Sequence, residues 1–462
     1  GPDYKRPEVN PPQAYREAAP PGESVANVPW WDLFGDETLK GLIREALNEN
    51  KDIRVSLARI QEARAALGYT KADQWPSLAY MGRASRTEID AAPNFLYPLA
   101  PRRLPAYGDV TSDMGLVAAD VSFQVDLWGR LRRSTESSRA QLAASEEAYR
   151  TTVITLVSDV ATAYLLMRQL DAQLEVARAT LDSRRESLRL IRAKFEAGYV
   201  PLLDVNQAEM LEASAASTVS SLERGLAQTE HALSFLLGRN PSEIPRGKPL
   251  DEQVFPPEVP AGLPSELLER RPDIRTAEEA LHAQMALIGV AKALMLPNLT
   301  LTGMYGHESM ELTGYPSGSG DFWTAAAGLI GPLFQFGKNK RRVEIQKAKT
   351  EEALRTYEKA ALNAFREVED GLVAVLTFRD EYEAVQRNLA AARSASKLSH
   401  ARYDAGYTNY LEVLDTDRIL FSSELQAAEV LQKRCASVIA LYKALGGGWQ
   451  VEGTSPPEAA AK

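Results

Sequence analysis

The 462-residue sequence lacks most of the residues from which catalytic and redox centres are built. It has a single cysteine, Cys435, so no disulfide can form within the chain and no thiolate cage can hold a metal. Its four histidines are scattered without metal-ligand spacing, and it has neither a phosphate-binding loop nor a dinucleotide-binding fingerprint. These absences predict a protein that is not an enzyme and that uses no metal or other cofactor.

Charge excludes a nucleic-acid-binding protein, and hydropathy excludes a protein with membrane-spanning helices. The chain has 53 basic and 62 acidic side chains, a net charge of −9, and its longest basic run is the segment 340–342. It therefore has no positive surface for a nucleic-acid backbone, and we expect no nucleic-acid partner. No run approaches the roughly 20 apolar residues of a membrane-spanning helix, so helical spanning is excluded. Membrane β-strands are not excluded, because their alternating pattern leaves little trace in hydropathy.

The chain contains an internal duplication. Residues 195–199 (FEAGY) match residues 403–407 (YDAGY) with an offset of 208, and the same offset places Gly129 on Gly337. Further upstream the offset is 221, so the first repeat has a loop that is 13 residues longer. One structural unit is therefore used twice. We predict an N-terminal extended segment 1–37, repeat 1 at 38–237, a proline-rich linker 238–264, repeat 2 at 265–445 and a C-terminal tail 446–462.

Each repeat is expected to contain one very long helix. Between Gly129 and Gly198 there is no proline and no other glycine, and apolar residues recur at alternating steps of three and four. This spacing is typical of a coiled-coil seam. The second repeat has the same pattern from residue 338 to residue 403. About 65 residues would make a rod of roughly 100 Å, which no compact domain contains.

The segments before these helices alternate with the period of a strand. At 117–127 every second residue is apolar and the others are mostly polar, and 298–305 alternates in the same way, whereas 321–336 does so less cleanly. The loops between the strands, 89–112 and 306–320, are rich in proline and glycine. Two strands of about ten residues match a membrane β-hairpin. A soluble hairpin with one buried face fits the strands alone about equally well.

The strand count constrains the assembly of a membrane form. Four strands cannot close a barrel with an open lumen, since even eight-stranded barrels are filled by side chains, and open sheet edges are not tolerated in lipid. If the hairpins cross a membrane, several copies must share one barrel, and three copies would supply 12 strands. In that case the fold is mainly α with a small β-barrel part, and a homotrimer is the expected assembly.

Four segments carry a resemblance to a known family. They are GPDYKRP at 1–7, WWDLF at 30–34, LLERRPDI at 267–274 and ALGGGW at 444–449. Together with the duplication and the helix lengths, they resemble the TolC-like outer-membrane efflux factors of Gram-negative bacteria, in the OprM-like lipoprotein branch. The resemblance covers nearly the whole chain. It implies a trimer with a 12-stranded outer-membrane β-barrel and a long periplasmic α-helical barrel, in which the proline-rich segments form an equatorial belt.

The resemblance also implies a function and partners. Such proteins are passive exit ducts of tripartite multidrug efflux systems, joined through a periplasmic adaptor protein to an inner-membrane pump, and they contact outer-membrane lipid. Members of the lipoprotein branch carry a lipidated cysteine shortly before the Pro-Asp-Tyr motif. This sequence has none there, so we expect the anchor to lie upstream of Gly1 or to be absent.

Two glycines are expected to end the long helices. Gly198 with Tyr199, and Gly406 with Tyr407, stop each helical pattern, and a new helix is predicted to begin near Leu202 and near Leu411. Glycine takes the left-handed conformation at a helix end at low cost. By residue pattern alone these are turns at the ends of a coiled coil. By resemblance they are the periplasmic tips, where the adaptor docks and the duct closes.

Acidic residues follow these turns. Asp204 and Glu412 are equivalent in the two repeats, and Asp415 lies one turn beyond Glu412 on the same helix face. The resemblance implies an acidic periplasmic gate in which Tyr403 bonds to Asp204 and the acids of three chains surround one axis. Thr408 departs from the family pattern, since some members have an arginine there. Without the resemblance, these acids would simply suit the positive end of a helix dipole.

A basic cluster near the start of each long helix has two interpretations. Lys338, Lys340, Arg341 and Arg342 match Arg130, Arg132 and Arg133 one repeat earlier. A solvated face at a helix start is the favoured interpretation. Contact with phosphate head groups, where a barrel would meet the periplasm, is the weaker alternative.

Two other functions fit parts of the sequence. A soluble coiled-coil scaffold would explain the rods and the duplication, but it would not explain alternating hairpins at matching places in both repeats. An outer-membrane duct for type I protein secretion would share every feature described above.

Overall fold

The computed structural model describes residues 1–9, 11–12, 14–16, 35–89, 110–253, 264–310 and 320–447. The predicted tail beyond residue 447, the WWDLF motif and most of both hairpin loops lie outside the described residues. The chain divides into two compact units. The sheet unit comprises 1–5, 63–142 and 280–353, and the helical unit comprises 6–62, 143–279 and 354–462.

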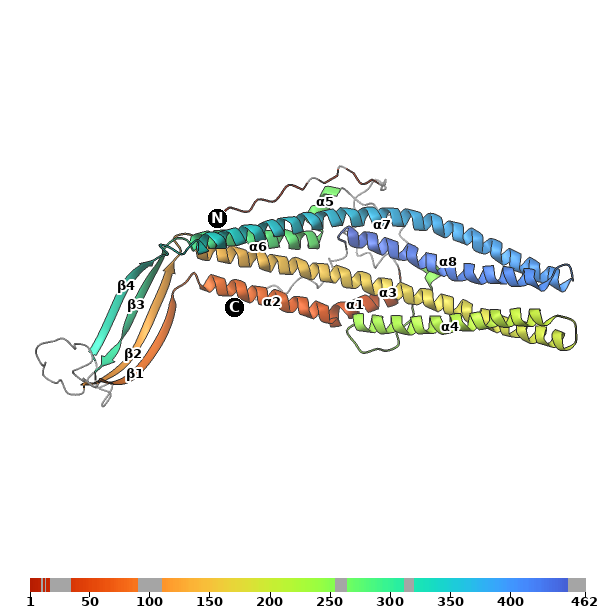
Figure 1. The fold of residues 1–462 in the computed structure, drawn as a ribbon, viewed down its shortest axis with the longest axis horizontal. Coiled ribbons are helices and arrows are strands. Elements are labelled where there is room, and N and C mark those ends of the chain that lie inside the picture. Colours follow the sequence, from red (N-terminus) through yellow and green to blue (C-terminus); the bar gives the residue numbers. More distant parts are fainter. Residues whose placement is uncertain are drawn as a thin grey trace, which may run out of the picture. The chain divides into compact units, whose positions relative to one another are not determined.

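Helices dominate the described chain, and the order of elements is similar in both halves (Figure 1). The first half contains α1 (Glu37–Glu49), α2 (Lys51–Ala72), β1 (Ser77–Ile89), β2 (Val110–Val125), α3 (Arg130–Glu196) and α4 (Leu202–Leu236). A short 3₁₀ helix, η3 (Leu250–Glu252), lies in the linker. The second half contains α5 (Pro264–Arg270), α6 (Pro272–Ala293), β3 (Asn298–Ser309), β4 (Gly320–Ile330), α7 (Lys338–Asp404) and α8 (Tyr410–Ala444). The two long helices, α3 and α7, each have 67 residues, in agreement with the prediction.

The two halves also share their backbone signature. Three pairs of glycines at the offset of 208 have positive φ angles, and they are Gly129 with Gly337, Gly198 with Gly406, and Gly238 with Gly446. The first pair precedes α3 and α7, the second pair follows these two helices, and the third pair follows α4 and α8. Left-handed backbone at matching positions is independent structural support for the duplication.

The four strands form one antiparallel sheet in the order β1-β2-β3-β4. The register places Val121 between Leu78 and Gly303, and Tyr305 between Ala119 and Trp323. One face of the sheet consequently carries an apolar set, which is Leu78, Tyr80, Val117, Val121, Phe123, Val125, Leu299, Leu301, Tyr305, Trp323 and Leu329. The opposite face carries Arg83, Asp120, Ser122, Gln124, Thr300, Thr302 and Thr324. The predicted alternation of apolar and polar faces is confirmed.

The apolar face is uncovered in the single chain. Tyr80 is 93 % exposed, Trp323 76 % and Leu78 75 %. β1 and β4 each have a neighbour on one side only, so the sheet has two open edges. An apolar surface of this extent needs a nonpolar environment.

Four predicted strand boundaries were wrong. β2 begins at Val110, inside the predicted loop 89–112, because its pairing with β1 extends to Ile89. β2 ends at Val125 instead of residue 127, because Asp126 turns back to accept hydrogen bonds from the amides of Leu131 and Arg132. β4 ends at Ile330 instead of residue 336, where Pro332 and the positive φ of Phe336 are incompatible with a strand. β3 continues to Ser309, four residues into the predicted loop, because its pairing with β2 extends that far.

The helical unit has its core along the seams of two antiparallel pairs. Figure 1 shows α3 beside α4 and α7 beside α8. Leu174, Ala177 and Leu181 of α3 pack with Ala215 and Val219 of α4 and with Phe421 of α8. Val385 and Leu389 of α7 pack with Ala427 and Val430 of α8. The predicted coiled-coil seam is therefore buried, and it joins helices from both repeats. One stretch of α3 is long and apolar enough to cross a membrane by composition, but 61 % of it is buried inside the protein, as in a core helix.

The LLERRPDI motif forms a packed polar junction. Arg271 is only 6 % exposed and forms ion pairs with Asp273 at 2.6 Å and with Glu367 of α7 at 2.7 Å. It also donates to the carbonyl oxygen of Ala444 at the end of α8. Burial alone would lower the pKa of Arg271, but the two carboxylates outweigh burial and raise it. This arginine therefore ties α6, α7 and α8 together.

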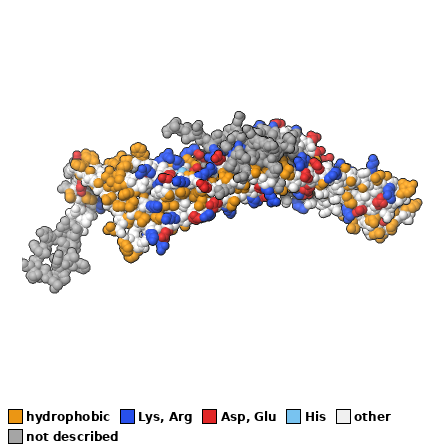
Figure 2. All heavy atoms as spheres, turned by 90° about the horizontal axis from the view of Figure 1, so that it is seen from above, with side chains coloured by type: hydrophobic (Ala, Val, Ile, Leu, Met, Phe, Trp, Pro, Cys, Tyr) orange, Lys and Arg blue, Asp and Glu red, His pale blue; other side chains and the backbone are white. Residues whose placement is uncertain are grey.

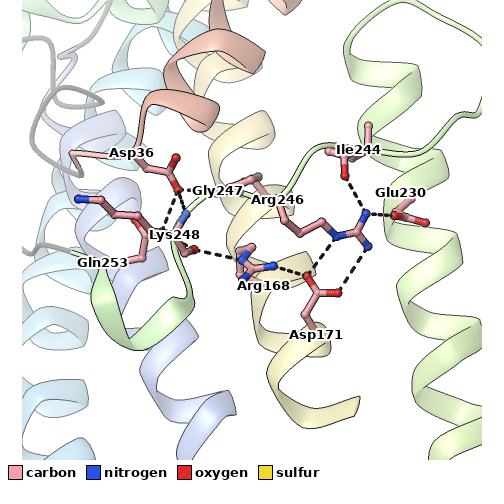
Figure 3. Close-up of polar contacts among 10 residues, drawn as sticks. Asp36, Arg168, Asp171, Glu230, Ile244, Arg246, Gly247, Lys248 and Gln253 are labelled. Carbon is pink, nitrogen blue, oxygen red and sulfur yellow. Dashed lines mark hydrogen bonds and ion pairs between the residues drawn. The ribbon is translucent and has the colours of Figure 1, made fainter. Parts of the chain in front are cut away.

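The proline-rich linker is clamped to α1 and α3 by a buried carboxylate (Figure 3). Asp36 is 1 % exposed and caps the start of α1 by accepting from the Thr38 amide at 2.9 Å and the Leu39 amide at 3.3 Å. It also accepts hydrogen bonds from the hydroxyl of Tyr164 on α3, the Lys248 amide and the Gln253 side chain, at 2.8, 3.1 and 3.0 Å respectively. Burial would raise the pKa of Asp36, but these hydrogen bonds outweigh burial and hold it below its usual value.

An ion-pair cluster fastens the neighbouring part of the linker. Figure 3 shows Arg246 between Asp171 of α3 and Glu230 of α4. The Arg246 guanidinium lies 3.3 Å from Asp171 and 2.5 Å from Glu230, and Arg168 adds a second contact to Asp171 at 2.6 Å. The linker is thus a fixed strap over the described residues 239–253.

Gly247→Ala is expected to destabilise this strap. A Cβ atom at Gly247 would lie 2.3 Å from an oxygen of Asp36 and 2.6 Å from the Tyr164 hydroxyl, so the buried hydrogen bonds would have to open. We expect a loss of about 1–3 kcal/mol, measured as a lower midpoint in thermal unfolding of the detergent-solubilised protein. Gly41→Ala is the matched control. No atom lies within 4 Å of its Cβ position and Gly41 is inside α1, so this change should be neutral or stabilising.

Candidate functional site

The ends of α3 and α7 are closed by glycine turns of the same geometry. At the first turn the Gly198 amide donates to the carbonyl oxygen of Phe195 at 2.8 Å and the Tyr199 amide donates to Lys194 at 2.9 Å. At the second, the amides of Gly406 and Tyr407 make the equivalent bonds. The φ angles of Gly198 and Gly406 are +80° and +76°. This is the Schellman arrangement, and it confirms that glycine ends both helices in the left-handed conformation.

The surface of the turns is apolar. Tyr199 is 82 % exposed and Tyr407 80 %. Leu202 and Leu203 in the first turn of α4, and Leu411 in the first turn of α8, are each more than half exposed. Figure 2 shows hydrophobic side chains gathered at this end of the helices. Exposed apolar groups at matching positions of both turns are typical of a contact surface.

Tyr403 makes ring contacts and does not form the predicted bond to Asp204 within the chain. Its ring lies 5.4 Å from that of Tyr410 and 5.1 Å from the ammonium group of Lys194. The two residues Tyr403 and Asp204 are both described, and the structure has no hydrogen bond between them. The Tyr410 ring packs against the core formed by α3 and α4 near Val205, so an aromatic contact takes the place expected for the hydrogen bond.

Tyr410, at the second turn, is partly buried and has a raised pKa. Burial, together with the negative charges of Asp417 and Asp204 and the nearby Tyr403 hydroxyl, raises the pKa of Tyr410 to about 12. The α8 helix begins at Tyr410, one residue before the predicted start, because Asn409 caps it by accepting from the Glu412 amide at 3.3 Å. Tyr410 was not among the residues predicted for the site. The equivalent residue in the first repeat is Leu202, and this change from leucine to tyrosine is the one sequence signal that distinguishes Tyr410.

Two of the three acids of the predicted gate have cationic partners inside the chain. Asp415 lies 2.7 Å from Arg418, and Glu412 lies 3.6 Å from Arg402. Glu412 also accepts a hydrogen bond from Thr408, the residue at which the sequence departs from the family pattern. Asp204 has no ion-pair partner among the described residues. The structure therefore brings Glu412 together with Thr408 and Arg402, and it leaves Asp204 as the unpaired carboxylate.

The described residues of the turns offer no candidate metal site. Within the described ranges, no group of three His, Cys, Asp or Glu side chains comes together as metal ligands. What the geometry offers is an apolar contact surface next to a set of paired charges.

Comparison with known families assigns the chain. A model of the outer membrane efflux protein family matches residues 42–239 and 263–447. The chain belongs to the outer membrane efflux protein family. The predicted resemblance is thus confirmed, and the two matched segments correspond to the two halves of the duplication.

Relatives of this efflux protein are similar over nearly their whole length. The solvent efflux pump outer membrane protein SrpC of Pseudomonas putida is 36 % identical over 421 residues, which are 91 % of this chain and 87 % of SrpC. The cation efflux system protein CusC of Escherichia coli K12 is 32 % identical over 452 residues, 97 % of this chain and 95 % of CusC. The crystal structure of the open state of the MtrE outer membrane channel of Neisseria gonorrhoeae has a TM-score of 0.84 at 30 % identity and covers 97 % of this chain and 98 % of that chain.

Family membership decides several predictions. The efflux protein is an outer-membrane channel of a Gram-negative bacterium with a large periplasmic helical part, and it is a transport duct and not an enzyme. The mainly helical fold with a small antiparallel membrane sheet is confirmed. The alternative of a soluble coiled-coil scaffold was wrong, because the chain belongs to a family of outer-membrane channels. In a soluble scaffold the apolar face of the sheet would also be exposed to water. The relatives also favour efflux over protein secretion.

Proposed function

We propose that three copies of this chain form one passive exit duct of a tripartite efflux system. The observation that supports a trimer is the four-stranded sheet with open edges at β1 and β4. Open edges are not tolerated in lipid, and three sheets joined edge to edge give a closed barrel of 12 strands. The apolar faces then contact lipid, and the polar faces with Asp120, Gln124 and Thr302 line the lumen.

We infer that the glycine turns are the periplasmic tips and carry the gate. Tyr403, Asp204, Glu412 and Asp415 are then the residues around the constriction. Because Tyr403 holds no hydrogen bond to Asp204 within one chain, a locking bond between them would have to form between neighbouring chains of the trimer. Within each chain, the contact of Tyr403 with Tyr410, and the packing of Tyr410 against the α3 and α4 pair, support closure.

The partners proposed for the tips are a periplasmic adaptor and, through it, an inner-membrane pump. The exposed apolar residues of both turns, Tyr199, Leu203, Tyr407 and Leu411, provide a contact surface repeated six times in a trimer. The relatives include proteins of solvent and cation efflux systems. An adaptor that docks on six similar tips fits this symmetry.

Gly198→Val and Gly406→Val test the role of the tips. A β-branched residue resists the positive φ of each turn, at a cost of about 1–2 kcal/mol or more per site, so the turn should change shape while the distant sheet stays intact. We expect efflux of solvents, cations and dyes to fall severalfold in a strain that depends on this channel, while trimers still reach the outer membrane. Gly68→Val on α2, where no atom lies within 4 Å of the Cβ position, is the control. Normal efflux in both tip variants would refute the docking role.

A further inference from the structure

A cluster of lysines and aromatic residues surrounds the start of α7 in the sheet unit. Its members are Lys292, Met295 and Leu296 at the end of α6, Leu333, Phe334 and Phe336 between β4 and α7, and Lys338 and Lys340 in the first turn of α7. We call this set the α7 collar. The Asn339 side chain donates to the carbonyl oxygen of Leu294 at 3.4 Å, which joins the end of α6 to the start of α7.

The apolar members of the α7 collar are exposed, most of all those between β4 and α7. Phe336 is 92 % exposed and Phe334 75 %, and their rings contact each other with centroids 4.6 Å apart. The chain leaves the sheet at Ile330 and reaches Phe334 only four residues later. Figure 2 shows hydrophobic side chains gathered over the helix ends beside the sheet, with Lys and Arg side chains among them. Since the sheet crosses the outer membrane, the α7 collar lies at the level where lipid meets the periplasm, where aromatic girdles are found.

The lysines of the α7 collar have no acidic partner among the described residues, and at one position the first repeat differs clearly. Arg132, the equivalent of Lys340, pairs with Asp126, which also accepts from the Arg132 amide. The next residue, Arg341, pairs with Glu344 as Arg133 pairs with Glu136. The residue equivalent to Asp126 in the second repeat is Phe334.

Lys292, Lys338 and Lys340 are exposed and form no ion pair with any described residue. α7 also has no acidic residue in its first turn, and cations there oppose the helix dipole. The local structure thus gives no stabilising reason for these three lysines.

We propose that the α7 collar binds anionic phospholipid head groups of the leaflet that faces the periplasm. The exposed rings insert at the edge of the acyl region, and the three lysines lie just outside it, at the depth of the phosphates. Long lysine side chains reach such a depth easily, and basic clusters beside membrane segments bind anionic lipids in this way. Three copies per trimer would form a discontinuous ring of lipid contacts that fixes the depth of the barrel.

The test uses the intact, reconstituted channel and phosphatidylglycerol as the probe. The collar variant is Lys292→Gln, Lys338→Gln and Lys340→Gln combined, and the matched control is Lys51→Gln, Lys359→Gln and Lys397→Gln, which removes the same charge from exposed lysines of the helical unit. The measurement is the shift of the thermal unfolding midpoint as phosphatidylglycerol replaces phosphatidylcholine in nanodiscs. We expect a saturable upward shift in the wild type and in the control, and an apparent affinity about tenfold lower in the collar variant.

Each outcome decides the proposal. An equal loss of lipid response in collar variant and control would mean that only net charge matters, and an unchanged response in the collar variant would show that the lysines are not involved. Inorganic phosphate or glycerol phosphate producing the same shift would identify a phosphate-ion surface instead of a lipid contact. Any of these results overturns the proposal. Unfolding in pure phosphatidylcholine checks that the collar variant is folded.

Discussion

Arg402→Gln combined with Arg418→Gln is expected to raise the preference of the channel for cations about tenfold. The structure pairs these arginines with Glu412 and Asp415, so the tips of a trimer hold six paired carboxylates instead of six bare ones. Removing the six guanidinium groups leaves the carboxylates unbalanced around one axis. A narrow pore lined by one sign of charge concentrates counter-ions by such factors. Single-channel recording in planar bilayers, with the reversal potential measured in a salt gradient, gives the permeability ratio.

The opposite substitution gives the opposite result. Glu412→Gln with Asp415→Asn nearly preserves shape but leaves Arg402 and Arg418 unpaired, so the preference for cations should fall or reverse, and block by divalent cations should weaken. Arg355→Gln with Arg366→Gln, which opens two similar exposed ion pairs on α7 away from the tips, is the control. If the two tip variants shifted selectivity in the same direction, or left it unchanged, these residues would not line the constriction.

Asp36→Ala is expected to cause the largest loss of stability of any single substitution considered for this chain. Five donors point at the Asp36 carboxylate from α1, α3 and the linker, and all of them would lose their acceptor in a buried place. The expected loss is roughly 3–5 kcal/mol, seen as a lower midpoint of thermal unfolding followed by helical circular dichroism.

The same carboxylate makes stability depend on pH. Hydrogen bonds hold the pKa of Asp36 below its usual value, so the unfolded chain binds this proton more readily than the folded chain. The contribution of Asp36 is therefore complete above about pH 5 and is lost as the pH falls through the folded pKa. Asp36→Asn should flatten the acid side of the stability profile. Glu37→Gln, at the exposed neighbouring residue, should leave the midpoint at neutral pH nearly unchanged. An unaltered acid profile in Asp36→Asn would show that another group controls it.

The sequence predicts the architecture well because the architecture depends on periodic signals. The seams of α3 and α7, the alternating faces of β2 and β3 and the glycine turns at Gly198 and Gly406 are each specified by residues close together in the chain. Duplication strengthens every one of these signals, since each is read twice.

The features that sequence reasoning missed depend on contacts between distant segments. Asp36 and Gly247 are 211 positions apart in the sequence but lie next to each other in the structure. No pattern near either residue indicates that they belong to a buried hydrogen-bond network. Arg271 was recognised only as part of a motif, whereas its role follows from Glu367 and Ala444. At the tips, the acids were predicted without their arginine partners, because an i to i+3 pair such as Asp415 and Arg418 is common on any exposed helix. The Tyr403 to Asp204 bond was carried over from the resemblance, and within the chain Tyr410 occupies that contact.

The central claim is that three chains share one barrel, and the mass of the intact particle tests it most directly. Native mass spectrometry of the protein extracted from the outer membrane, with detergent removed in the gas phase, counts the chains. One chain has a mass of 50.7 kDa, and its sheet contributes four strands. The account predicts a single species of about 152 kDa, three chains and 12 strands, plus any lipid anchor. A stable particle of one or two chains would contradict it, because four or eight strands cannot enclose an open lumen.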